Sequence, residues 1–217
     1  GLQGGMARVT PQHEYVDFGE PQIAGDRLIT LNTSMLRPAE IVAISLSDGS
    51  WKQLSHENDD ILAEVEDIKM DEVWIPTTDG KKMLTWVLYP QGFNPDSKYP
   101  VIMMCNGGPQ SSLSQSWSTR WNFRLMASQG YIVILPNRRG NVGFGQEWKE
   151  QISGDYIGQN MRDYLSAADY FKAFLTQAFD FADPTMVELS WDEVFNTTTG
   201  KLDSNAAVIG GQYPFFT

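Results

Sequence analysis

Residues 99–109 read Tyr-Pro-Val-Ile-Met-Met-Cys-Asn-Gly-Gly-Pro, and residues 130–136 read Gly-Tyr-Ile-Val-Ile-Leu-Pro. Each stretch contains an uninterrupted apolar run next to glycine or proline. Strands of this kind are buried on both faces, which is typical of a parallel sheet covered by helices. The two runs therefore predict two strands at the centre of an α/β fold.

After each of these runs, apolar residues recur at the spacing of a helix. Residues 111–129 carry apolar side chains at helical intervals, and Gly130 is suited to cap that helix. Residues 154–178 predict a second helix. Its expected buried side consists of Met161, Leu165, Ala168 and Phe171 or Lys172.

A hairpin is predicted upstream of the two runs. Residues 72–76 and 83–89 are strand-like, and Asp79-Gly80 between them supplies the positive φ that a tight turn requires. A hairpin followed by strand, helix, strand and helix is an α/β layout.

The first 65 residues have a different pattern. Short strands are expected at residues 26–31, 40–46 and 51–54, with the turn Ser-Asp-Gly-Ser at residues 47–50. This pattern is typical of one blade of a β-propeller, which closes only by radial repetition and does not stand alone. At the other end of the chain, residues 172–217 are rich in aromatic side chains but contain no further apolar strand.

Composition narrows the choice of partners. The chain has 217 residues and a formal net charge of −11, so a nucleic-acid partner or an anionic membrane surface is not expected. No stretch approaches the ~20 apolar residues of a membrane span, and we expect a soluble protein. The single cysteine, Cys105, excludes an internal disulfide and a thiolate metal cluster, and we expect it to be buried and inert.

The turn Asn-Gly-Gly-Pro-Gln-Ser-Ser at residues 106–112 carries the chemistry. A glycine-rich turn after a buried strand is where many acyl-transfer enzymes place a hydrogen-bond donor for the oxyanion. Asn106 and Gly107 are the candidate donors. Asn106 keeps two interpretations, because its side-chain amide either donates to an oxyanion or caps the following helix.

The second run is followed by Asn-Arg-Arg-Gly-Asn-Val-Gly-Phe-Gly at residues 137–145. With this segment the chain resembles the prolyl oligopeptidase family of serine peptidases, in particular its dipeptidyl-peptidase-like branch. That family has H-G-G-P or Y-A-G-P after its third strand and R-G-S-x-G-Y-G after its fourth. Residues 77–81 and 86–90 resemble its entry hairpin, and residues 34–41 and 56–59 resemble its last propeller blade and the segment after it. The resemblance covers about residues 20–171.

The resemblance implies a two-domain peptidase that cleaves short peptides without a metal or organic cofactor. It also implies that the complete parent protein is periplasmic or secreted. It divides the chain into the remnant of a last propeller blade (residues 1–65), the N-terminal half of an α/β-hydrolase domain (residues 66–171) and an unassigned aromatic tail (residues 172–217). A peptide substrate is the expected partner. The sequence gives no indication of the oligomeric state.

Arginines 138 and 139 belong, with Gly140, to a structural loop in this interpretation. We expect a carboxylate, Asp155 or Asp163, to bind one of the two arginines and to fix the loop after the fourth strand.

The catalytic triad has no counterpart in the sequence. A triad on this fold runs Ser, Asp or Glu, then His, after the oxyanion turn. No G-x-S-x-G motif occurs, and both histidines, His13 and His56, precede the turn. The serines between residues 111 and 118 begin the expected helix, so no catalytic residue is assigned.

We therefore expect a peptidase fragment that is inactive as this chain. Two alternatives remain: a noncatalytic peptide-binding or interaction module on a partial hydrolase fold, and an esterase with an unusual nucleophile, which lacks a visible base.

Overall fold

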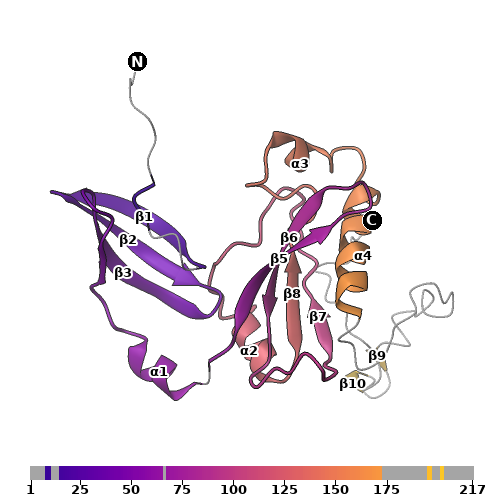
Figure 1. The fold of residues 1–217 in the computed structure, drawn as a ribbon, viewed down its shortest axis with the longest axis horizontal. Coiled ribbons are helices and arrows are strands. Elements are labelled where there is room, and N and C mark those ends of the chain that lie inside the picture. The colour runs from indigo at the N-terminus through magenta and orange to yellow at the C-terminus, as the bar shows by residue number, and fades with distance from the viewer. Residues whose placement is uncertain (1–7, 11–14, 66, 173–194, 197–200, 203–217) are drawn as a thin grey trace. The chain divides into compact units, whose positions relative to one another are not determined.

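The computed structural model describes residues 8–10, 15–65, 67–172, 195–196 and 201–202 (Figure 1). The chain forms two compact units, which are considered separately below. The first comprises Gly1–Met70, Leu88–Gly92 and Leu113–Gly130, and the second comprises Asp71–Val87, Phe93–Ser112 and Tyr131–Thr217. Two short antiparallel strands, β9 (Phe195–Asn196) and β10 (Lys201–Leu202), lie beyond the main part of the second unit.

The first unit is built on a four-stranded antiparallel sheet in the order β1-β2-β3-β4. Its strands are β1 (Asp17–Ala24), β2 (Arg27–Ser34), β3 (Arg37–Ser45) and β4 (Trp51–Gln53). The three strands predicted in this part of the chain are present, and the tight turn before β4 contains Gly49 with φ 72°.

Strand β1 was not predicted, and its sequence explains why. It contains Gly19, Glu20 and Pro21, which interrupt the apolar alternation of a strand. The pairing with β2 shifts register between Gly19 and Gln22, and Glu20 has φ 49°. A β-bulge therefore accommodates residues that argue against a strand in the sequence.

Glu40 of β3 fixes the segment that follows the sheet. Its carboxylate is buried and accepts hydrogen bonds from the Asn58 backbone N–H at 2.9 Å, from Asn58 Nδ2 at 2.8 Å and from the Ser55 hydroxyl. Burial by itself would raise the pKa of Glu40, but these hydrogen bonds outweigh it and lower the pKa. Asn58 directly precedes helix α1 (Asp59–Glu64), so the buried carboxylate sets where that helix begins.

The second unit contains a four-stranded sheet in the order β5-β6-β8-β7. The strands are β5 (Met70–Pro76), β6 (Lys82–Leu88), β7 (Val101–Met103) and β8 (Ile132–Pro136). The predicted hairpin is confirmed, since the Thr77 N–H donates to the Lys81 carbonyl at 2.9 Å across the turn between β5 and β6.

The two apolar runs form the parallel pair β7 and β8, in which Val101 is paired with Ile132 and Met103 with Ile134. All five residues of β8 are buried, as predicted. The same prediction is wrong for β7, whose three residues are only partly buried. In the described part of the sheet β7 pairs only with β8, so one of its edges has no neighbouring strand.

The helix expected at residues 111–129 is much shorter. Helix α2 of the first unit spans Phe123–Ser128, and the Asn122 side chain caps it by accepting the Leu125 N–H at 2.9 Å. The preceding serines favour local hydrogen bonds over a helix, as when Ser118 Oγ accepts the Trp121 N–H at 3.0 Å. Gly130 follows the helix with φ 91°, as expected of a glycine just after a helix end.

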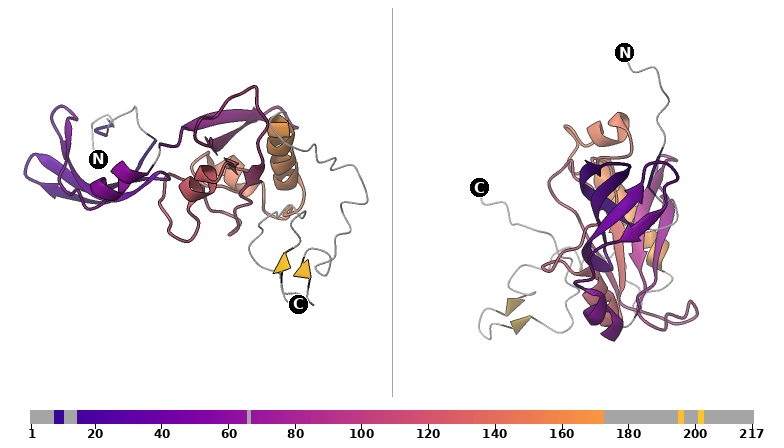
Figure 2. Two further views of the ribbon diagram at one scale, coloured as in Figure 1. Left: turned by 90° about the horizontal axis from the view of Figure 1, so that it is seen from below. Right: turned by 90° about the vertical axis from the view of Figure 1, so that its left-hand side faces the viewer.

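Helix α4 (Gln159–Phe171) packs against β8 and lies alongside the sheet (Figures 1 and 2). The predicted buried side of this helix is largely wrong, because Met161 and Leu165 are 45% and 44% exposed. The residues that α4 buries are Asn160, Asp163, Tyr164, Ala167 and Phe171. The buried side of α4 is therefore partly polar, and its Asp163 and Tyr164 form hydrogen bonds with the loop after β8. The short helix α3 (Gln146–Glu150), absent from the predicted elements, buries Trp148.

A matched pair of alanine substitutions tests which side of α4 is buried. Ala167 is fully buried, and its neighbour Ala168 is partly exposed. We expect Ala167→Leu to lower the free energy of unfolding by about 1–3 kcal/mol, because an added isobutyl group overpacks the core. Ala168→Leu should change it by less than about 0.5 kcal/mol. Urea denaturation of both variants measures the difference, and equal effects would contradict this orientation of the helix.

Candidate functional site

The candidate site lies where three loops of the second unit meet. Strands β7 and β8 are parallel, so the segments that follow them leave the same edge of the sheet. These segments are residues 104–112 and 137–145. The turn of the β5–β6 hairpin joins them through side-chain contacts, and the N-terminal half of α4 lies beside all three.

Arg138 ties the loop after β8 to the turn after β7. Its side chain is 2% exposed. One guanidinium nitrogen, Nη2, donates to the Asn106 carbonyl at 2.9 Å, and Nη1 donates to the Pro109 carbonyl at 2.8 Å. Nε donates to the Tyr164 hydroxyl at 3.2 Å, and that hydroxyl in turn donates to the Asn106 carbonyl at 3.2 Å.

Arg138 carries its charge without a carboxylate at ion-pair distance among the described residues. Its donors go to backbone carbonyls and to one phenol, and its guanidinium lies 5.9 Å from the centre of the Tyr164 ring. An arginine does not lose its proton in a protein, so the cation persists in this buried position. Its charge therefore lies directly against the carbonyls of the turn at residues 106–109.

Gly140 is required by this arrangement. It has φ 96°, and a Cβ atom at this position would lie 2.6 Å from Arg138 Nη1 and 2.6 Å from the Pro109 carbonyl oxygen. Any side chain would therefore enter the hydrogen bond between Arg138 and Pro109. Two physical constraints, the positive φ and the lack of space, select glycine here.

Arg139 binds the hairpin turn instead. Its guanidinium forms a fork with Asp79, with Nη1 at 2.6 Å from Oδ2 and Nη2 at 2.5 Å from Oδ1, and Nη2 also donates to Thr77 Oγ1 at 3.1 Å. The guanidinium stacks over Trp148 at 4.7 Å from the ring centre. The Arg139 backbone N–H donates to Asp163 Oδ2 at 2.9 Å.

The pKa values of the two carboxylates around Arg139 are shifted in opposite directions. The hydrogen bonds from Arg139 are the largest influence on Asp79 and hold its pKa far below the usual range. Burial dominates at Asp163, which is fully buried, and raises its pKa although the Arg139 N–H and Gln159 offset part of this effect. Asp155, the other expected partner of an arginine, instead accepts the Gln159 N–H at 3.1 Å.

The candidate oxyanion residues lie on the outer side of this network. The Asn106 side chain donates from Nδ2 to Ser111 Oγ at 2.7 Å, and Ser111 Oγ donates to the Gly107 carbonyl at 2.6 Å. Asn106 is partly buried and Gly107 is exposed. The Asn106 side-chain amide therefore forms a hydrogen bond inside the turn, to Ser111.

Several residues of the network were missed in the sequence. Asp79 was read only as part of a turn, and Tyr164 and Trp148 were not singled out. The spacing of Asn160, Asp163, Tyr164, Ala167 and Phe171 is also helical, so the inner side of α4 was visible as a second periodic stripe in which polar residues occur. Cys105, next to the turn, is partly buried, and burial raises the pKa of its thiol.

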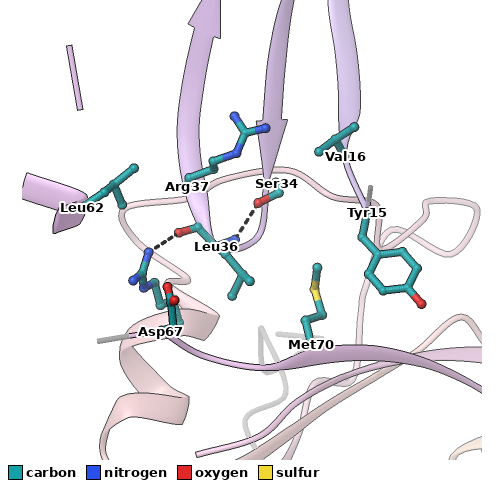
Figure 3. Close-up of a pocket in the computed structure, with 9 residues that line it drawn as sticks. Tyr15, Val16, Ser34, Leu36, Arg37, Leu62, Asp67 and Met70 are labelled. Atoms are coloured by element: carbon teal, nitrogen blue, oxygen red, sulfur yellow. Dashed lines mark hydrogen bonds between the residues drawn. The ribbon is translucent and has the colours of Figure 1, made fainter. Parts of the chain in front are cut away.

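A surface cavity of about 380 Å³ belongs to the first unit and contains none of the candidate residues. Figure 3 shows the residues that line it, among them Leu36, Met70 and Tyr15. Its two arginines bind the chain itself: Arg124 Nη1 donates to the Leu36 carbonyl at 2.7 Å, and Arg37 contacts Asn32. We assign no ligand to it.

Within the described ranges, no cluster of three or more His, Cys, Asp or Glu side chains is arranged to bind a metal ion. The same part of the chain has no helix that is both long and apolar enough to cross a membrane.

Comparison with known sequences supplies the family context. Residues 117–180 match the prolyl oligopeptidase family. A dipeptidyl-peptidase 5 of Porphyromonas endodontalis is 53% identical over 168 residues, which are 77% of this chain and 24% of that protein. A dipeptidyl-peptidase 5 of Porphyromonas gingivalis is 49% identical over 161 residues, or 74% of this chain and 23% of that protein. The chain thus spans about a quarter of the length of these relatives.

Solved structures show the same fold. An acylaminoacyl peptidase of Pyrococcus horikoshii aligns with a TM-score of 0.62 and 24% identity over 74% of this chain and 25% of its own. Dipeptidyl peptidase 4 of Porphyromonas gingivalis aligns with a TM-score of 0.57 and 20% identity over 72% of this chain and 23% of its own.

The fork between Arg139 and Asp79 predicts a pH-dependent stability. The pKa of Asp79 is lowered on folding, so its ionised form stabilises the fold above the unfolded pKa of about 4, and this contribution is lost as the pH falls. Asp79→Asn should lower the free energy of unfolding at pH 7 by about 1–2 kcal/mol, because Asp79 is partly exposed and solvent screens the pair.

The difference between Asp79→Asn and the unmodified chain should shrink steadily below pH 4. Urea denaturation at pH 7, 5 and 3 measures it, with Asp96→Asn on an exposed loop as the control. A deficit that stays constant over this range would show that the ionised carboxylate is not responsible.

Proposed function

We propose that this chain, which matches the prolyl oligopeptidase family at residues 117–180, forms the N-terminal portion of the catalytic domain of a serine peptidase of that family. Residues 66–171 make up this portion in the proposal. The order of the strands along the chain supports it, because β7 is the third strand of this sheet in the sequence and is followed by the glycine-rich turn. That is the position from which α/β-hydrolases supply one oxyanion donor.

The four-stranded antiparallel sheet of the first unit is, in this proposal, the last blade of a β-propeller that precedes the catalytic domain. Residues 1–65 are assigned to it. Its support is the meander of β1 to β4 in chain order, which is the arrangement of a propeller blade. Residues 172–217 remain unassigned.

The observation that carries the proposal is the clamping of the turn by Arg138. The Asn106 and Pro109 carbonyls both accept from one buried guanidinium, which fixes the turn between them. Oxyanion stabilisation works through donors whose positions are set before the reaction begins. A loop that served only to connect a strand to a helix would not require a buried cation to fix it.

The substrate class follows from the relatives. Both Porphyromonas relatives described above are named dipeptidyl-peptidase 5. We therefore propose that the complete protein to which this chain belongs releases dipeptides from peptide chains. The chain alone carries the oxyanion turn without a recognisable nucleophile or base, and we propose that it is inactive on its own. Without its triad a serine hydrolase keeps only the rate that oxyanion donors and binding supply.

Labelling with a fluorophosphonate tests the inactivity directly. We expect no covalent adduct on the purified chain and no release of dipeptides from dipeptidyl-coumarin substrates, because no serine of the described residues is hydrogen-bonded to a histidine. The dipeptidyl-peptidase 5 of Porphyromonas endodontalis serves as the positive control. Intact mass and peptide mapping detect any adduct, and a stoichiometric label on one serine would disprove the proposal.

A chimera tests the positive half of the proposal. The 168-residue segment of the Porphyromonas endodontalis relative that aligns with this chain is replaced by the corresponding residues of this chain. We expect hydrolysis of dipeptidyl-coumarin substrates within about tenfold of the relative's kcat/KM, equivalent to roughly 1.4 kcal/mol. A folded chimera without activity would favour the noncatalytic binding module instead.

A further inference from the structure

We propose that Arg138 is a positioning residue for the oxyanion turn, where it aims and polarises the backbone N–H of Gly107. The inference rests on the proposed function and names the group that performs it. Arg138 itself does not touch the substrate in this arrangement. It acts through the peptide group that joins Asn106 to Gly107.

The direction of the Gly107 N–H follows from the geometry of the peptide group. No cis peptide bond occurs in the described residues, and in a trans peptide the N–H points opposite to the C=O of the preceding residue. The Asn106 carbonyl points inward, toward Arg138 Nη2 and the Tyr164 hydroxyl. The Gly107 N–H therefore points away from the buried network, on the exposed side of the turn.

Side-chain hydrogen bonds also fix the neighbouring peptide groups. The Gly107 carbonyl accepts from Ser111 Oγ at 2.6 Å, and the Pro109 carbonyl accepts from Arg138 Nη1 at 2.8 Å. Rotation of the peptide plane at Gly107 would break contacts on both sides of it. One hydrogen of Asn106 Nδ2 closes the turn through Ser111, whereas the backbone N–H of Gly107 points out of the turn.

Two donors on one carbonyl also strengthen the N–H of the same peptide. Hydrogen bonds in a chain polarise one another by perhaps 10–30% per bond, and a charged donor polarises more than a neutral one. The Asn106 carbonyl accepts from a guanidinium and a phenol at once. Its peptide group is therefore more polar than that of an ordinary loop, and its N–H is a stronger donor.

The charge of Arg138 adds a second effect. No carboxylate of the described residues lies at ion-pair distance from it, and the guanidinium lies directly behind the turn. Negative charge that develops on an oxyanion in front of the turn is attracted by this cation. A neutral side chain of the same length would keep some hydrogen bonds but lose this attraction.

The first experiment uses the full chain and needs no activity. In ¹H–¹⁵N spectra, Arg138→Gln and Tyr164→Phe should both move the Gly107 amide proton upfield, because each removes a donor from the Asn106 carbonyl. Tyr164→Phe retains the ring and serves as the mild variant in case Arg138→Gln fails to fold. Arg162→Gln, an exposed arginine on the same helix as Tyr164, should leave the Gly107 resonance unchanged. An unshifted Gly107 resonance in folded Tyr164→Phe would overturn the inference.

The second experiment measures catalysis in the chimera. Arg138→Gln should lower kcat by about 100-fold and change KM by less than about threefold, because a misplaced oxyanion donor affects mainly the transition state. Arg162→Gln should retain the kcat of the unmodified chimera. A raised KM with unchanged kcat would place Arg138 in substrate binding and overturn the inference.

The two experiments separate the proposals. An unmodified chimera that folds but does not turn over contradicts the proposed function. The Gly107 resonance in the full chain then decides on its own whether Arg138 and Tyr164 polarise this peptide.

Discussion

The second unit depends on two adjacent guanidinium groups that are each 2% exposed. Burying one cation costs several kcal/mol unless its hydrogen-bond donors find acceptors, and two neighbouring buried arginines need twice as many acceptors. Arg139 forms ion pairs with the carboxylates of Asp79 and Asp163, although its Nε, 3.4 Å from Asp163 Oδ2, makes no hydrogen bond. Arg138 donates to carbonyl oxygens and to a phenol. The hairpin, the turn after β7 and α4 are each joined to the loop after β8 by contacts of these two residues.

This demand explains the unusual inner side of α4. A helix that covers a sheet usually presents apolar residues to it. Here Asp163 and Tyr164 lie on the buried side because the loop after β8 needs an acceptor for the Arg139 N–H and a partner for Arg138. Met161 and Leu165, which a simple apolar pattern assigns to the core, lie on the exposed side.

Sequence patterns predicted the elements whose environment is local. The Asp79-Gly80 hairpin and the buried strand β8 were found because turn chemistry and continuous apolar residues suffice to specify them. The elements that were missed or only partly correct depended on contacts that periodicity does not reveal: β1 is held by pairing with β2 despite Pro21, and α2 begins only where Asn122 caps it. The burial of β7 was overestimated because it depends on a neighbouring strand, which periodicity does not reveal.

The candidate site shows the same division. The motifs of the sequence suggested Asn106, Gly107, Arg138, Arg139 and Gly140 as candidates, but not which residue each arginine binds, since the partners lie up to 62 residues away. Tyr164, Ser111 and Gly140 fix the turn together with Arg138, and all of them lie between residues 106 and 164. The geometry of this turn is thus set within one compact unit, so in the proposed function its donor is preorganised without the nucleophile.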